Sequence, residues 1–581
     1  MSNNRKTKTM ETFRVALGQV NCVVGDLQGN CAKMLYYAEK AKTSGADIVA
    51  FPELAVTGYP PEDLLLKPKF IEDNLKALND FSGSIQDIVV IAGFVNISDG
   101  YLHNAAAVIF DKEIKGIYHK TLLPNYGVFD EKRYFKAGCE PLVFNYGNIL
   151  FGVSICEDIW QKDGPTKMQV LKGAQLIINI NASPFHAGKI RMREKIITAL
   201  AADNHVPFVY TNLVGGQDEL VFDGQSIVAN EKGEIIAKAD AFKEDLLVVD
   251  VTIKRQKTEN RGQRTNLNLI SVSPKGNLSF KRLSGDREKK PPIPGKKAES
   301  LSDVAEVYEA LKLGLHDYLV KNGFKKVVIG LSGGIDSSLV AVIAVDALGK
   351  ENVVGVSMPS RYTSEISRLD AKELSDNVNI KLLEVPIEKI YSVYLTTLST
   401  TFKGLPDDIT EENIQARIRG NILMALSNKF EWLVLTTGNK SEMSVGYATL
   451  YGDMAGGFGV IKDVPKTLVY ELSRYRNNAC RVIPERILTR VPTAELKPEQ
   501  KDQDTLPPYD ILDRILEAYI EKDTSGETIV SSVFQNETVN KTIRMVDLSE
   551  YKRRQSPPGI KITPKAFGKD RRMPITNKYR G

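Results

Sequence analysis

Residues 325–349, KKVVIGLSGGIDSSLVAVIAVDALG, limit the possible fold more than any other stretch of the chain. The apolar run at 327–329 predicts a buried strand, an SGG turn follows it, and residues 336–349 predict the next helix. Further strand-like runs, NVVGVSM, KLLEVPI and WLVLTTG, come later with helical stretches between them. Because strands that alternate with helices form parallel sheets, this region predicts an α/β domain with a mainly parallel sheet.

The earlier part of the chain has a similar alternation. Short β-rich runs such as FRVALGQV, ADIVAFPE, ILFGVSIC and AQLIININ are separated by stretches with the helical spacing of apolar residues, which predicts another α/β domain. A charged, proline-rich stretch at 286–303 marks the boundary. The expected divisions are a flexible N-terminus at 1–12, an α/β domain at 13–255, a linker region at 256–303, an α/β domain at 304–551 and a basic tail at 552–581.

Composition excludes several classes of protein. No uninterrupted apolar run approaches the ~20 residues that a membrane span requires. The polar N-terminus has no apolar region of the signal-peptide kind, so secretion is not expected. The five cysteines include no CxxC pair, which favours a reducing cytoplasm over a disulfide framework or a zinc site. A net charge of +5 is small for 581 residues and argues against a wholly nucleic-acid-binding protein.

The SGG turn predicts a phosphate-binding loop that lacks the lysine of the Walker A motif. Backbone N–H groups of Ser332, Gly333 and Gly334 at a helix N-terminus would bind an anion, and Asp336 beside phosphate is expected to hold Mg²⁺. The ordinary alternative is a serine-capped helix start. The segment resembles the pyrophosphate loop of the ATP pyrophosphatases. That resemblance implies that the loop binds the β and γ phosphates, which leave as pyrophosphate when a substrate oxygen is adenylated.

Three polar residues stand at the ends of apolar runs in the first domain: Glu53, Lys120 and Cys156. A cysteine is an acyl-transfer nucleophile once a base takes its proton, and a lysine stabilises an oxyanion. Taken singly, each has an ordinary alternative: Glu53 as an acid at a turn, Lys120 as a solvated cation and Cys156 as a buried apolar thiol. Their contexts, FPEL, HKTLLPNYGVFDE and CEDIW, resemble those of the Glu-Lys-Cys triad in the nitrilase superfamily.

A nitrilase-like amidase joined to a pyrophosphate-loop domain resembles the glutamine-dependent NAD synthetase family, over nearly the whole chain. The resemblance implies an α/β fold with an N-terminal nitrilase-like αββα sandwich. It also implies a C-terminal parallel-sheet domain of the adenine-nucleotide α-hydrolase-like, pyrophosphate-loop kind. In that family the amidase hydrolyses glutamine, and the ammonia amidates deamido-NAD after ATP has adenylated its carboxylate, with release of AMP and pyrophosphate.

The resemblance implies these roles, residue by residue. Glu53 is the general base, Lys120 the oxyanion stabiliser and Cys156 the nucleophile, and Glu131 orients Lys120. The expected glutamine-binding positions are Tyr126, Ser183 and Lys189. ATP is expected at Gly330, Leu331, Ser332, Gly333, Gly334, Ile335, Asp336, Ser337 and Thr437. Deamido-NAD is expected at Asn413, Glu442 and Lys552, and Mg²⁺ at Asp336 and Glu442. Helix capping or a surface contact is the alternative for Asn413 and Glu442.

Partners are expected to be small molecules and further copies of the chain, with neither nucleic acid nor membrane. We expect a solvated helical face for Arg417 and Arg419. One alternative is an amidating or thiolating enzyme that acts on tRNA or a purine nucleotide, since the basic C-terminal run could contact phosphates. Another is a nucleotide-binding scaffold without catalysis, against which the intact Glu53, Lys120 and Cys156 argue.

Overall fold

The computed structural model describes residues 10–147, 149–254, 269–272, 291–531 and 535–579. The chain divides into two compact units, the first formed by Met1–Gln217 and Phe222–Leu301 and the second by Asp218–Val221 and Ser302–Gly581. Residues 1–9 of the expected N-terminal segment, and 256–268 and 273–290 of the expected linker, lie outside the described residues.

A six-stranded sheet forms one layer of the first unit. Its three central strands are parallel, and antiparallel strands flank them on both sides. In spatial order the strands are β14 (Asp245–Lys254), β1 (Met10–Gln19), β2 (Ile48–Ala50), β3 (Val89–Ser98), β4 (Tyr101–Phe110) and β5 (Glu113–His119).

A seven-stranded sheet forms the facing layer. In spatial order its strands are β13 (Ile235–Lys238), β12 (Ile227–Ala229), β9 (Phe208–Asn212), β8 (Leu176–Asn181), β7 (Ile149–Ile155), β6 (Val143–Tyr146) and β15 (Leu269–Ser271). Strand β15 lies within the segment expected to be a linker, and it pairs in parallel with β6. A separate hairpin consists of β10 (Val214–Gln217) and β11 (Leu220–Asp223).

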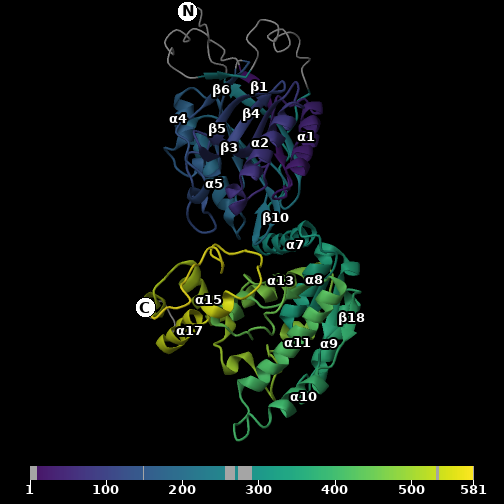
Figure 1. The fold of residues 1–581 in the computed structure, drawn as a ribbon. Helices are drawn as coiled ribbons and strands as arrows, with labels where there is room; N and C mark the ends of the chain where they lie inside the picture. The colour runs from purple at the N-terminus through teal and green to yellow at the C-terminus, as the bar shows by residue number, and fades with distance from the viewer. Residues whose placement is uncertain (1–9, 148, 255–268, 273–290, 532–534, 580–581) are drawn as a thin grey trace, which may run out of the picture. The chain divides into compact units, whose positions relative to one another are not determined.

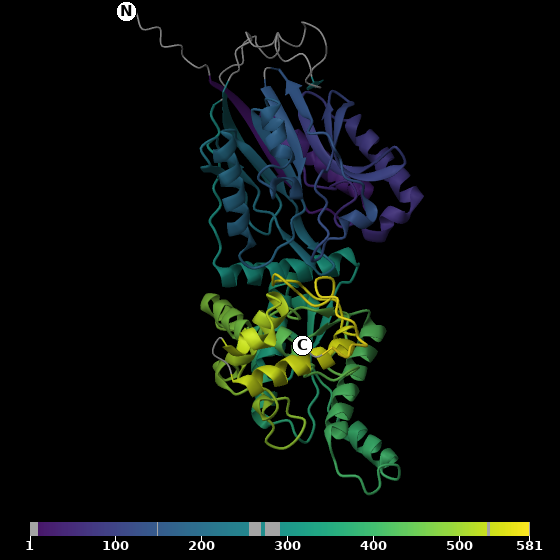
Figure 2. The same cartoon turned by 90° about the vertical axis from the view of Figure 1, so that its left-hand side faces the viewer.

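The two sheets share one apolar core, to which β1 contributes Phe13 and Leu17 and the second sheet Phe144 and Phe151. Helices cover the outer faces, as Figures 1 and 2 show: α1 (Leu27–Thr43) and α2 (Pro68–Ser82) on the first sheet, α4 (Pro165–Leu171) and α5 (Lys189–Asn204) on the second. Burial on both faces explains why the strands are apolar throughout rather than alternating. The expected αββα arrangement is confirmed. Short helical turns occupy η1 (Glu62–Leu66), α3 (Glu131–Tyr134) and η2 (Cys156–Ile159).

The second unit contains a five-stranded, fully parallel sheet, as the sequence predicts. In spatial order its strands are β18 (Lys381–Glu384), β17 (Val353–Ser357), β16 (Val327–Gly330), β19 (Leu433–Thr436) and β20 (Phe458–Gly459). Strand β16 leads through the SGG turn into α8 (Ile335–Leu348), and α8 packs on β16 and β17. The central strand β16 and its neighbour β19 also contact α11 (Ile409–Phe430).

The helices of this unit surround the sheet, and α10 (Glu388–Leu398) projects from the body of the unit together with the start of α11 (Figures 1 and 2). From α7 to α12 they are α7 (Asp303–Lys321), α8 (Ile335–Leu348), η4 (Lys350–Asn352), α9 (Glu365–Asn377), α10 (Glu388–Leu398), α11 (Ile409–Phe430) and α12 (Lys440–Val445). The later ones are α13 (Lys466–Ala479), α14 (Glu485–Thr489), η5 (Asp502–Asp504), α15 (Tyr509–Leu516), η6 (Glu517–Glu521), α16 (Gly526–Ser531), α17 (Asn536–Leu548) and α18 (Glu550–Arg553).

The segment expected to be a basic tail is packed into this unit. Arg553, Lys561, Thr563 and Arg571 are buried, as are the apolar Ile560 and Ile562 that lie between them. Three cations of this segment, Arg553, Lys561 and Arg571, are therefore packed inside the protein, whereas Arg554, Arg572 and Lys578 are exposed.

One glycine in β3 is required by the turn beside it. A Cβ atom at Gly93 would lie 2.3 Å from the backbone nitrogen of Leu54 and 2.4 Å from the carbonyl oxygen of Pro52. Leu54 itself has φ 48°, in the left-handed region. We therefore expect Gly93→Ala to displace the 52–54 turn and to lower the free energy of unfolding by ~1–3 kcal/mol, measured by urea denaturation.

Gly83→Ala is the matched control, since its new Cβ atom would meet its nearest neighbour at 3.5 Å, an ordinary contact. Equal unfolding midpoints for the two variants would contradict this account of Gly93.

Candidate active sites

In the first unit, the three expected catalytic residues lie just beyond strand ends and are buried. Glu53 follows β2, Lys120 follows β5 and Cys156 follows β7. The ammonium of Lys120 donates to Oε1 of Glu53 at 2.7 Å and to Oε1 of Glu131 at 2.7 Å. Glu131 therefore contacts Lys120, as a residue that orients this lysine would.

Further contacts hold the carboxylate of Glu53. Oε1 accepts a hydrogen bond from Nδ2 of Asn104 at 2.7 Å, and Oε2 accepts from the backbone N–H of Ala182 at 2.9 Å. Sequence reasoning missed Asn104, whose only signal was a polar residue at the start of the apolar run NAAAVIF. With these bonds Glu53 has one fixed orientation.

The charges of this cluster support one another. Burial works against the charged form of Lys120, but Glu131 and Glu53 outweigh it and raise the pKa of the lysine well above its ordinary value. Burial raises the pKa of Glu131 to about 7, with Lys120 opposing the shift. Lys120 is therefore a permanent cation held between two acids.

The backbone at Cys156 turns sharply out of β7. Its φ of 42° lies in the left-handed region that non-glycine residues rarely adopt. Burial, and then the charge of Glu53, raise the pKa of the thiol well above its ordinary value, while Lys120 lowers it. The resting group is therefore the neutral thiol, and it needs a base to become a nucleophile.

Asp158 fastens the turn that carries Cys156 to the segment that carries Lys120. This buried carboxylate accepts from the backbone N–H of Ile155 at 2.9 Å and of Leu122 at 2.9 Å. The hydroxyl of Tyr118 donates to it at 2.8 Å. Asp158 thus links the 3-10 turn that begins at Cys156 to residues on both sides of Lys120 in the chain. Cys156 and Lys120 therefore keep a fixed separation.

The expected glutamine positions surround this cluster. The hydroxyl of Tyr126 donates to both carboxylate oxygens of Glu157 at 3.1 Å, and its side chain is 57% exposed. Ser183 follows Ala182 directly and is buried. The ammonium of Lys189 donates to the carbonyl oxygen of Pro184 at 2.8 Å.

Arg193, which sequence reasoning missed, holds the loop that carries Ser183. Its guanidinium donates to the carbonyl oxygen of Ser183 at 2.8 Å and to Asp223 at 2.7 Å. Both side chains of this ion pair are 1% exposed. A fully buried, two-oxygen pair of this kind fixes the loop geometry because each partner would be costly to leave alone.

In the second unit, a cavity of about 310 Å³ lies at the carboxyl ends of β16, β17 and β19. All the expected ATP positions, from Gly330 to Ser337 together with Thr437, line it. Glu442 lines it as well. Sites at this edge of a parallel sheet are the rule in α/β proteins.

The loop geometry explains its glycines. Gly333 has φ 76°, and a Cβ atom there would lie 2.2 Å from the carbonyl oxygen of Ser367. Gly334 occupies the N-cap of α8, and its carbonyl accepts from the hydroxyls of Ser337 at 3.0 Å and Ser338 at 2.7 Å. The residues at the start of the helix line the cavity, which is where an anion-binding loop presents its N–H groups.

The two expected metal ligands meet at one cation. Lys466 donates through Nζ to Oδ2 of Asp336, and to Oε1 of Glu442 at 3.2 Å. Burial raises the pKa of Glu442, with Lys466 opposing and Asp336 adding to the shift. Two carboxylates that converge on one positive charge at the edge of a phosphate-binding loop suit Mg²⁺, which takes carboxylate and phosphate oxygens together.

Glu442 also completes a capping box at the start of α12. The side chain of Asn439 accepts from the backbone N–H of Glu442 at 3.0 Å, and its Nδ2 donates to Oδ1 of Asp336 at 2.9 Å. The capping role expected as the alternative for Glu442 is thus present, alongside its place in the cavity wall.

Asn413 and Lys552 are not among the described residues that line the cavity. Oδ1 of Asn413 accepts from the hydroxyl of Thr449 at 2.8 Å, and Thr449 does line it. The ammonium of Lys552 donates to the carbonyl oxygens of Gly446 and Ala448, both at 2.8 Å. Both residues therefore hold the loop that follows α12.

Arg419 corrects an expectation. Arg417 is exposed, as predicted, but Arg419 lines the cavity and burial lowers its pKa to about 10. Its Nε donates to the carbonyl oxygen of Met358 at 3.1 Å. The prediction failed because residues two apart on a helix point in different directions, and only the packed sheet decides which of them faces the site. Lys466 and Asp502, also in the lining, carried no sequence motif.

Comparisons with known proteins divide the chain in the same way. A family model described as carbon-nitrogen hydrolase matches residues 14–259, and one described as NAD synthase matches 307–556. The glutamine-dependent NAD(+) synthetase of Thermotoga maritima is 50% identical over 98% of this chain and 100% of its own length. The glutamine-dependent NAD(+) synthetase of Aquifex aeolicus is 48% identical over 98% of this chain and 100% of its own length.

The chain belongs to the glutamine-dependent NAD(+) synthetase family.

Solved structures agree. The glutamine-dependent NAD+ synthetase of Acinetobacter baumannii, in complex with ADP, is 43% identical, with a TM-score of 0.74 over 98% of this chain and 99% of its own. The Cytophaga hutchinsonii structure shares the fold at 24% identity and a TM-score of 0.80, over 98% of each chain. No helix among the described residues combines the length and apolar character of a membrane span.

Two histidines next to residues of the first site in the chain are expected to make the stability of the fold depend on pH. The rings of His103 and His119 stack with centroids 4.0 Å apart, next to Asn104 and Lys120 in the chain. Burial, with a contribution from His103, lowers the pKa of His119 to about 4. An unfolded histidine titrates near 6.5, so the unfolded chain binds more protons between these values. Stability due to neutral His119 is therefore present above pH 6.5 and is lost as the pH falls towards 4.

As the pH falls from 7.5 to 5, we expect the free energy of unfolding to decrease less for His119→Gln than for the unchanged protein. Urea denaturation at each pH measures this decrease. His205→Asn, which removes an exposed imidazole at the end of α5, is the control. A pH dependence of the His119→Gln variant identical to that of the control would contradict the assignment.

Proposed function

We propose that this chain amidates deamido-NAD to NAD with nitrogen from glutamine and energy from ATP, releasing glutamate, AMP and pyrophosphate. The observation that carries the proposal is the presence of two different sites in one chain. One holds a buried thiol beside Glu53 and Lys120, and the other a glycine-lined anion loop with Asp336 and Glu442. The first suits amide hydrolysis and the second adenylation.

At the first site, Glu53 takes the thiol proton as Cys156 Sγ attacks the side-chain amide carbon of glutamine. Lys120 stabilises the oxyanion that forms, because its charge is fixed and buried. Collapse expels ammonia, which receives the proton from Glu53, and leaves a glutamyl thioester. Glu53 then takes a proton from water, the hydroxide attacks the thioester, and glutamate leaves as the thiol is restored. Tyr126, Ser183 and Lys189 would bind the remainder of glutamine.

At the second site, the backbone N–H groups between Ser332 and Ser337 would hold the β and γ phosphates at the start of α8. The carboxylate oxygen of deamido-NAD attacks the α phosphorus, and pyrophosphate leaves. Ammonia then attacks the adenylated carbonyl carbon, one proton of the ammonia passes to solvent and AMP leaves, which forms the amide. Thr437 would contact ATP, and Glu442, with Asn413 and Lys552, would position deamido-NAD.

We assign a Mg²⁺ ion to Asp336 and Glu442, together with phosphate oxygens of ATP. When bound, the ion neutralises charge on the phosphates. The ammonium of Lys466, which bonds to both carboxylates, would lie next to the bound Mg²⁺.

The assignment of domains follows: 13–255 as the amidase, 304–551 as the synthetase, and 552–581 as a segment that completes the second site. None of the five cysteines, all of which lie among the described residues, forms a disulfide, which supports a reducing cytoplasm. Exposed apolar side chains on α10, on the segment that follows it and at the start of α11 support a homo-oligomer, since Val393, Leu405 and Ile409 are 63%, 70% and 66% exposed. The burial of Lys561 and Arg571 disfavours a tRNA-binding tail.

Cys156→Ala is expected to lower glutamine-dependent NAD formation by more than ~10³-fold, because the nucleophile is removed. Synthesis from added ammonium should persist. Product formation with each nitrogen source, followed by chromatography, checks this. Cys139→Ala, at an exposed thiol, is the control. Loss of both activities in Cys156→Ala would refute the division between sites.

Asp336→Asn is expected to lower the formation of AMP and pyrophosphate by at least ~100-fold with either nitrogen source, because a charge beside the phosphates is lost. Basal hydrolysis of glutamine to glutamate should remain. Asp376→Asn, at an exposed acid in α9, serves as the control. Undiminished pyrophosphate release from Asp336→Asn would remove the basis for the assigned metal site.

A further inference from the structure

Helix α12 carries Glu442 but is only six residues long. A single short helix has little stability of its own, so tertiary contacts must set its position. Every turn of α12 is tied to a distant part of the chain. The carbonyl of Ser444 accepts from Arg553 at 2.6 Å, and that of Val445 accepts from the hydroxyl of Ser549 at 3.1 Å.

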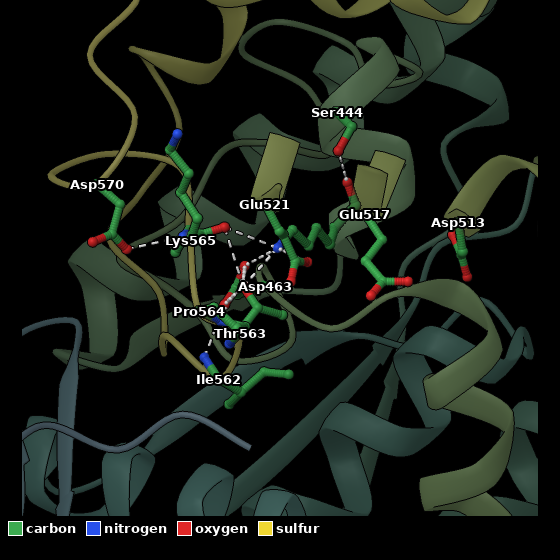
Figure 3. A network of polar contacts seen from close by, with 12 residues as sticks. Ser444, Asp463, Asp513, Glu517, Glu521, Ile562, Thr563, Pro564, Lys565 and Asp570 are labelled. Carbon is green, nitrogen blue, oxygen red and sulfur yellow. Dashed lines mark hydrogen bonds and ion pairs between the residues drawn. The ribbon is translucent and has the colours of Figure 1, made fainter. Parts of the chain in front are cut away.

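The strongest of these ties is at Lys440, the first residue of the helix. Lys440 is 2% exposed. Its ammonium donates to Glu521 at 2.8 Å, to Oγ1 of Thr563 at 2.6 Å and to the carbonyl oxygen of Lys565 at 3.1 Å. It also forms an ion pair with Asp463 at 3.0 Å. Figure 3 shows Asp463, Thr563 and Lys565 grouped beside Glu521. We call this group the Lys440 junction.

Asp463 locks the C-terminal segment into the junction. Its Oδ2 accepts from the backbone N–H groups of Ile562 and Thr563, both at 2.8 Å (Figure 3). The ammonium of Lys561 closes the same turn by donating to the carbonyls of Thr563 and Pro564, both at 2.8 Å. The junction thus joins α12, the end of the loop before α13, η6 and the segment 561–565.

In the chain, Lys440 lies close to two of the three residues that meet at the second site, Asp336, Glu442 and Lys466. Asn439, which precedes Lys440, bonds to Asp336, and Glu442 follows two residues later. On the other side, the backbone N–H of Lys440 donates to the carbonyl of Val464 at 2.9 Å, two residues before Lys466. A shift of Lys440 would therefore move Glu442 and Lys466 relative to Asp336.

Lys440 itself does not face the substrates. The described residues that line the cavity do not include it, whereas Asp336, Glu442 and Lys466 are all present. Burial opposes its charge, but Asp463 and Glu521 raise its pKa above the ordinary value. A permanent buried charge with no access to ligand acts through the groups that it holds.

We propose that Lys440 is a positioning residue for the synthetase reaction, through which the C-terminal segment 561–565 sets the place of Glu442 opposite Asp336. This inference rests on the proposed role of Glu442. It assigns the end of the chain a function in the chemistry without any contact with substrate.

The test compares Lys440→Met with Lys565→Met. The control removes a cation from the same segment, but that ammonium pairs with exposed Asp523, and its backbone carbonyl still accepts from Lys440. In Lys440→Met, kcat for ammonium-dependent NAD synthesis should fall ~10–100-fold, with a smaller change in KM for ATP. Mn²⁺ affinity, measured by electron paramagnetic resonance with α,β-methylene-ATP present, should weaken by a similar factor.

An unchanged rate of glutamine hydrolysis in Lys440→Met would show that the first unit is folded. Calorimetry shows whether the second unit is folded. Should Lys440→Met fail to fold, Thr563→Val removes only the hydroxyl and should weaken Mn²⁺ binding in the same direction. Values of kcat and Mn²⁺ affinity equal to those of Lys565→Met, in either folded variant, would overturn the proposal.

Glu442→Gln separates the two levels of inference. Full synthetase activity in Glu442→Gln would mean that the proposed function of this residue is wrong. A defective Glu442→Gln beside an unaffected Lys440→Met would leave the proposed function standing and overturn the positioning role alone.

Discussion

A buried ammonium held between carboxylates is the interaction on which both candidate sites depend. Lys120 lies between Glu53 and Glu131 in the first unit, and Lys466 between Asp336 and Glu442 in the second. Such an arrangement costs desolvation free energy and is stable only when every partner is present and well placed. Each lysine therefore fixes two acids at a defined position, and the surrounding structure must supply that position.

The sheets supply it by bringing strand ends together. In the first unit the groups follow β2, β5 and β7, which belong to two facing sheets, and left-handed backbone at Leu54 and Cys156 turns the chain towards the shared site. In the second unit a single parallel sheet places the glycine loop after β16 and the helix with Glu442 after β19. The same principle thus produces an amide-hydrolysing cluster between sheets and an anion-binding edge on one sheet.

The C-terminal segment gives the second site its rigidity. Residues that look like a basic tail are packed in the unit: Thr563 bonds to Asp463 and Lys440, and Lys561 donates to the carbonyl oxygen of Thr563. The site is consequently completed by residues more than a hundred positions from the glycine loop, and adenylation depends on contacts that no substrate touches.

The sequence by itself determined the alternation of strands and helices, the parallel sheet and the glycine loop, since these follow from local periodicity and from the positive φ that Gly333 requires. It also determined Glu53, Lys120 and Cys156 as candidates, through short motifs. Only the tertiary structure decided their partners. Asn104, Arg193, Lys440 and Lys466 act across long separations, such as the 130 residues between Lys466 and Asp336, and β15 joined a sheet from an expected linker. Long-range contacts leave no local pattern, because any polar residue that packing brings to the right place can make them.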